Sequence, residues 1–110
     1  MEINPVLKEA IKYEFTCYYH ANLPDEWNRT DDEWADMATA SARRLASRIK
    51  SKPLCYELAD LFIEAAKNSQ HPVVQFICDI PWIDWYEEEK DWQLLQQLLR
   101  VMAAGIRNLH

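Results

Sequence analysis

The chain has 110 residues, of which 49% are hydrophobic, and it carries a formal net charge of −6. This apolar content is sufficient for a buried core and argues against intrinsic disorder. One glycine and five prolines are too few turn-forming residues for a sandwich or barrel of many short strands. We therefore expect a single domain over residues 1–110 with an all-α fold, a compact bundle of four to five helices.

The same composition restricts the cellular setting. No apolar run approaches the roughly 20 residues that a membrane span requires, and the start lacks the pattern of a secretory signal. Cys17, Cys55 and Cys78 form no CxxC pair, which is typical of the reducing cytosol. The acidic pI weighs against affinity for nucleic acid or anionic lipid. We expect a cytoplasmic protein that binds neither nucleic acid nor membrane directly.

A first helix is predicted over residues 5–21, because Asn4 is a good N-cap and a proline follows it. Its apolar face includes Cys17 and Tyr18. Glu14 projects into the middle of that face, and a buried carboxylate must be paired, protonated or functional. We expect either a buried ion pair between Glu14 and an arginine of the second helix, or a position for Glu14 at a gap in the packing.

The second helix is predicted to start at the capping box Thr30-Asp-Asp-Glu33 and to extend to about Lys50. Residues 25–36 carry six acids and one arginine, whereas no acid stands between residues 37 and 56. This polarity suits the helix dipole. An alanine-rich apolar face should let another helix approach closely. The bases near the end of this helix are Arg43, Arg44, Arg48, Lys50 and Lys52.

A third helix, the most buried one, is predicted from Ser51 to about Lys67. Residues 73–80 follow a loop and place apolar side chains at helical spacing, although Val73-Val-Gln-Phe-Ile77 would also suit a strand. Because no second strand is present to pair with it, we expect a short helix that ends before Pro81.

Residues 79–92 hold three of the five tryptophans together with six acids and one lysine. They lead into a last helix, expected from a second capping-box pattern at Asp84 to about Asn108. Trp92 begins its apolar face, and Gly105 indicates either a close helix contact or a fraying end.

The exposed part of residues 79–92 is the candidate interaction surface. Tryptophan and tyrosine are enriched at binding hot spots, and carboxylates would orient a basic partner. The alternative is an ordinary helix start whose acids match the dipole. The candidate interaction residues are Asp79, Trp82, Trp85, Tyr86, Glu87, Glu88 and Glu89.

Catalytic and cofactor motifs are missing. The chain has no glycine-rich phosphate loop and no nucleophile elbow. Cys17 and His20 are three residues apart, but helical projection turns Cys17 to the core and His20 to solvent. The histidines His20, His71 and His110 are scattered, so we expect them at the surface. We expect no catalytic residue, no metal site and no cofactor.

An alternative enzymatic interpretation comes from two acidic pairs. Glu33 and Asp36 on the second helix and Glu57 and Asp60 on the third could hold Mg²⁺ against a nucleotide's phosphates. The segment Glu57-Leu-Ala-Asp60-Leu-Phe62 resembles the all-helical MazG-like nucleotide pyrophosphohydrolases. This resemblance implies a Mg-dependent nucleoside triphosphate pyrophosphohydrolase, although Asp36 stands where that family prefers glutamate.

The function that we favour is a non-catalytic interaction protein. A small acidic helical domain can occupy a basic surface on a protein partner, as inhibitors of nucleases or other nucleic-acid-binding proteins do. Toxin-immunity, anti-CRISPR and anti-restriction proteins are of this kind, and the analogy rests on size, charge and helicity. A homodimer, in which the basic block of one subunit meets an acidic block of the other, is a further interpretation.

Overall fold

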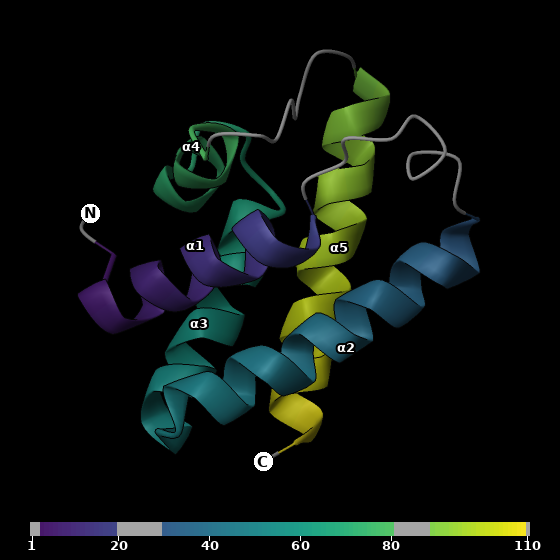
Figure 1. The fold of residues 1–110 in the computed structure, drawn as a ribbon. Helices are drawn as coiled ribbons and strands as arrows, with labels where there is room; N and C mark the ends of the chain where they lie inside the picture. Colours follow the sequence, from purple (N-terminus) through teal and green to yellow (C-terminus); the bar gives the residue numbers. More distant parts are fainter. Residues whose placement is uncertain (1–2, 20–29, 81–88, 110) are drawn as a thin grey trace.

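Five helices make up most of the computed structural model, which describes residues 3–19, 30–80 and 89–109, without the side chains of 89–91 (Figure 1). The predicted all-α bundle of four to five helices is confirmed. Residues 73–80, for which a strand was the alternative, belong largely to the short fourth helix. The helices are α1 (Pro5–Tyr18), α2 (Asp31–Ile49), α3 (Lys52–Ala65), α4 (Pro72–Cys78) and α5 (Glu89–Asn108).

Side chains cap the first four helices as hydrogen-bond acceptors for free backbone N–H groups. The Oδ1 atom of Asn4 accepts from α1 at 2.9 Å, and the Oγ atom of Ser51 accepts from α3 at 3.4 Å. Thr30 and Glu33 form the predicted capping box at the start of α2. His71 caps α4. Each of these four helices therefore begins after a residue whose side chain accepts a hydrogen bond from its first turn.

The position of His71 corrects the prediction of a surface histidine. Its side chain is buried, and its Nδ1 atom accepts the N–H of Val73 at 3.1 Å. The Nε2 atom lies 3.5 Å from the carboxylate of Glu64. The imidazole is buried because it caps α4 in the tight connection from α3, a contact between elements that sequence spacing does not reveal.

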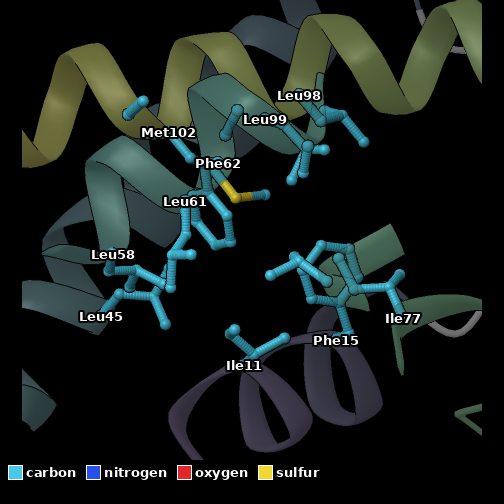
Figure 2. Packing of buried hydrophobic residues seen from close by; sticks show 14 of the residues in the cluster. Ile11, Phe15, Leu45, Leu58, Leu61, Phe62, Ile77, Leu98, Leu99 and Met102 are labelled. Atoms are coloured by element: carbon cyan, nitrogen blue, oxygen red, sulfur yellow. The ribbon is translucent and has the colours of Figure 1, made fainter. Parts of the chain in front are cut away.

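Helix α5 lies against both α2 and α3, whereas α1 packs on α2 and α4 (Figure 1). All five helices send apolar side chains into one shared core (Figure 2). Burying each such large apolar side chain contributes about 1.5–3 kcal/mol to stability. One fully buried example from each helix is Phe15, Leu45, Phe62, Ile77 and Met102.

Helices α5 and α2 approach each other closely where Gly105 of α5 faces Ala42 of α2. A Cβ atom added to Gly105 would lie 2.7 Å from the Cβ atom of Ala42, closer than carbon atoms tolerate. Of the two interpretations of Gly105, the structure therefore supports the close helix contact. The alanine-rich face of α2 allows this approach, as its composition predicted.

Two predictions about α1 are wrong in detail. The helix ends at Tyr18, and Cys17 is exposed instead of lying in the core. The buried stripe runs along Leu7, Glu14 and Phe15, so Cys17 falls at its margin. Tyr18 lies on the predicted face, where an arginine of α2 stacks on its ring. Tyr18 nevertheless remains 43% exposed.

Helix α3 also ends early, at Ala65, where the chain turns toward His71. The predicted start of the last helix, Asp84, lies outside the described residues; α5 is described from Glu89, and Trp92 is buried as expected. Among the described helices, none combines the length and apolar character that a membrane crossing needs.

Candidate functional site

Most of the predicted interaction surface lies outside the described residues. Asp79 is exposed and terminates α4, where its N–H bonds to the carbonyl of Gln75 at 3.1 Å. Glu89 is the first residue of α5. The acidic-aromatic surface therefore stays a prediction. The predicted residues outside the described part are Trp82, Trp85, Tyr86, Glu87 and Glu88.

One residue of each acidic pair forms a contact unrelated to metal binding. Glu33 accepts hydrogen bonds from Thr30 in the capping box, and Asp60 forms an ion pair with Arg107 of α5. Asp36 and Glu57 are exposed. Within the described residues no three or more histidine, cysteine or acidic side chains lie close enough to hold a metal ion.

This separation follows from the fold. The first acidic pair stands in the first two turns of α2, whereas α3, which carries the second pair, begins beside the other end of α2. A helix of 19 residues is about 28 Å long at 1.5 Å per residue. The structure thus does not bring the two pairs together.

A different group of residues is brought together between α1 and α2, and we call it the α1–α2 groove. It is open to solvent, has a volume of about 570 Å³ and contains four bases and one acid. Its size falls in the range of roughly 300–1,000 Å³ that is common for ligand sites. The lining residues are Tyr13, Glu14, Tyr18, Arg43, Arg44, Ser47, Arg48 and Lys50.

The acid of the groove is Glu14, whose side chain is only 3% exposed. Arg44 donates to both of its carboxylate oxygens, with the shortest N–O distance at 2.8 Å. This pair joins Glu14 to an arginine of the second helix, as the sequence predicted. The hydrogen bond from Arg44 to Glu14 raises the pKa of the guanidinium above its usual value.

Two hydroxyl groups complete the environment of this carboxylate. The Ser41 Oγ atom donates to Glu14 at 3.1 Å, and the Tyr19 hydroxyl lies 2.6 Å from Ser41 Oγ. Because the single Ser41 proton points to Glu14, Tyr19 must donate to Ser41. The buried carboxylate is therefore satisfied by several donors, as burial of a charge requires.

Two tyrosines of α1 support the arginines of the groove. The guanidinium carbon of Arg44 lies 3.7 Å from the ring centre of Tyr18, and that of Arg48 lies 3.6 Å from the ring centre of Tyr13. Such cation–π contacts are worth about 0.5–1 kcal/mol at exposed sites. They also hold each guanidinium in a defined plane before any ligand arrives.

The remaining cations of the groove are available to a ligand. Arg43, Arg48 and Lys50 are exposed, and none forms an ion pair with an acid in the part of the chain that the structure describes. Lys50 adopts a left-handed backbone conformation with φ of 58°, which ends α2. Glu14 is paired with Arg44. The other three bases of the groove can therefore donate hydrogen bonds to an anionic group of a ligand.

The sequence pattern contains part of this site. The block of bases near residue 50 can be recognised in the sequence. It did not indicate a binding site, because bases are also expected near the C-terminal end of a helix, where they interact favourably with its dipole. Tyr13 and Tyr18 gave no signal, because pairing them with Arg48 and Arg44 depends on how α1 lies across α2. In comparisons with protein-family models, curated proteins and solved structures, the chain matches none of them.

Proposed function

We propose that this chain is a non-catalytic interaction protein that binds a protein partner. The observation that carries the proposal is the pair of arginine–tyrosine stacks in the α1–α2 groove. Tyr13 is 46% exposed and Tyr18 is 43% exposed, and each lies against a guanidinium. Arginine and tyrosine are enriched among the residues that dominate protein–protein affinity. Because the stacks order these side chains in advance, less entropy is lost on binding.

We further propose that the partner is a nuclease or another nucleic-acid-binding protein with a basic surface, and that binding inhibits it. Acidic residues on this chain that could contact such a basic surface support the proposal. They are Asp79, exposed at the end of α4, and the acids at the exposed start of α2. The acids of residues 84–89 would extend it. The three thiols are free, which fits a reducing cytoplasm.

The test is affinity capture of partners from the native host, followed by mass spectrometry and an activity measurement on the captured protein. We expect a nuclease or nucleic-acid-binding protein whose activity falls when this chain is added. Charge reversal at Glu87, Glu88 and Glu89 should weaken capture while the helical circular dichroism is unchanged. Full-strength capture by that variant would show that the acids only stabilise a helix start.

A homodimer is the second candidate, and it is favoured by the charge distribution along α2. Exposed acids such as Asp32 and Asp36 stand at one end, and exposed bases such as Arg43 and Lys50 stand at the other. Two antiparallel copies of α2 would match opposite charges twice. Sedimentation velocity at low and high salt tests this candidate, since a monomer at both would eliminate it.

A further inference from the structure

The α1–α2 groove carries positive charge in a protein whose net charge is −6. Four of its lining side chains are bases, and only Arg44 is neutralised by Glu14. Arg43, Arg48 and Lys50 have no acid bound to them within the described residues. A concave surface of one charge sign attracts groups of the opposite sign.

The groove contains two tyrosine–arginine stacks. Only one of the two arginines binds a carboxylate of the described residues. Arg44 lies on the ring of Tyr18 and holds the carboxylate of Glu14. One helical turn later, Arg48 lies on the ring of Tyr13 at nearly the same distance, but without a carboxylate from the described residues. The planar guanidinium matches a carboxylate through two parallel hydrogen bonds. The stacked guanidinium of Arg48 can therefore bind a carboxylate in the same way as that of Arg44 does.

We infer that a segment of the protein partner bearing aspartate or glutamate side chains occupies this groove. A carboxylate of the segment binds Arg48, and neighbouring carboxylates lie near Arg43 and Lys50. The inference rests on the proposed function, because it assigns a part of the partner to a surface of this chain. Metal-dependent nucleases carry clustered carboxylates beside basic surfaces for nucleic acid, so a partner of that class offers both charges.

A peptide carboxylate fits the groove better than a nucleic acid or polyphosphate does. Nucleic-acid affinity depends on many bases along one surface, whereas this chain is acidic overall. The exposed faces of Tyr13 and Tyr18 offer apolar area that side chains of a peptide can cover.

The test measures binding of fluorescein-labelled hexaglutamate to the full chain by fluorescence anisotropy at low salt. Labelled hexaglutamine controls for charge, and unlabelled tripolyphosphate serves as a competitor. The variants are Arg48→Glu and Arg43→Glu, the second of which leaves both tyrosine stacks intact. Arg100→Glu, on the exposed side of α5, changes the net charge equally and is the matched control. Circular dichroism verifies that each variant is folded.

We expect hexaglutamate to bind with a Kd below about 1 mM and hexaglutamine to show no binding. Arg48→Glu and Arg43→Glu should each weaken binding of the peptide by about tenfold or more, while the Kd for Arg100→Glu stays within about twofold of the wild-type value. Equal binding by folded Arg43→Glu and wild type would overturn the inference. So would tripolyphosphate that binds more tightly than the peptide, because the groove would then be a phosphate site.

This outcome is separable from that of the proposed function. A partner captured equally well by wild type and by Arg48→Glu would refute the groove assignment and leave the interaction function standing. If the host yields no partner but the peptide binds as expected, the carboxylate site stands and the proposed inhibitor function does not.

Discussion

Arg44 of α2 and Glu14 of α1 form a buried ion pair in which the guanidinium nitrogens lie 2.8–3.1 Å from the carboxylate oxygens. The two partners differ in exposure, since the side chain of Arg44 is 35% exposed and that of Glu14 is 3% exposed. Removing one partner therefore has a different consequence from removing the other.

Arg44→Ala should be the more damaging of the two substitutions. It leaves the Glu14 carboxylate buried without its countercharge, which typically costs about 3–5 kcal/mol. Glu14→Ala leaves an arginine that can turn to water, and we expect a loss of about 1–3 kcal/mol because the buried Ser41 hydroxyl loses its acceptor. Urea unfolding of both single variants and the double variant measures the coupling. Equal losses would contradict the difference in exposure.

Gly105→Ala should destabilise the protein, although alanine is the better helix former by about 1 kcal/mol. The new methyl group would lie 2.7 Å from the Cβ atom of Ala42, and both atoms are fixed by backbone. Overpacking of this kind costs about 1–3 kcal/mol. Thermal unfolding checks the prediction, and Ala42→Gly in the same chain should recover part of the loss. A more stable Gly105→Ala variant would show that α2 and α5 are further apart.

The cysteines should differ in reactivity. Burial raises the pKa of the Cys55 and Cys78 thiols above the ordinary value of 9.0, whereas Cys17 is exposed. At pH 8, iodoacetamide should therefore modify Cys17 first and Cys55 only after unfolding. Peptide mass spectrometry over a time course measures the order. Simultaneous modification of Cys17 and Cys55 would contradict the burial of α3.

The raised pKa values also predict a pH dependence of stability. Because the fold favours the neutral thiol, this contribution is fully present below the unfolded pKa near 9.0 and is lost as pH rises through the raised folded pKa. The free energy of unfolding of wild type should therefore fall more steeply above pH 9 than that of Cys55→Ala. Parallel curves for the two proteins would contradict the assignment to Cys55.

The pyrophosphohydrolase alternative makes a distinct prediction. It requires Mg²⁺-dependent release of pyrophosphate from nucleoside triphosphates, abolished by Asp60→Asn. We expect no turnover, because Asp60 pairs with Arg107 and its partner residues are not gathered around it. A panel of nucleotides with a coupled pyrophosphate assay decides the matter. Turnover that depends on Asp60 would refute the interaction function in favour of the enzyme.

The helices could be predicted from the sequence because their signals are local. The cap at Thr30, the periodic apolar faces and the small residue at 105 each depend on neighbours in the same helix or on simple close approach. The exposure of His71 and Cys17 was predicted wrongly because it depends on how the helices and their connections pack, which spacing along one helix does not determine.

The candidate site illustrates the same limit. The unusual position of Glu14 could be recognised from a charge on an apolar face, and an arginine of the second helix was the natural partner. The stacks of Tyr13 on Arg48 and of Tyr18 on Arg44 join residues 35 and 26 positions apart. Only the crossing of α1 over α2 brings them together, so the groove emerged from the tertiary structure.

The most direct test of partner binding through the groove is the affinity of the captured partner for wild type, Arg48→Glu and Arg100→Glu, measured by isothermal titration calorimetry. Since hot-spot arginines contribute about 2 kcal/mol or more, we expect Arg48→Glu to weaken binding by at least about tenfold. Arg100→Glu, with the same change of net charge, should bind like wild type. Equal affinities for all three proteins would contradict a role of the α1–α2 groove in binding.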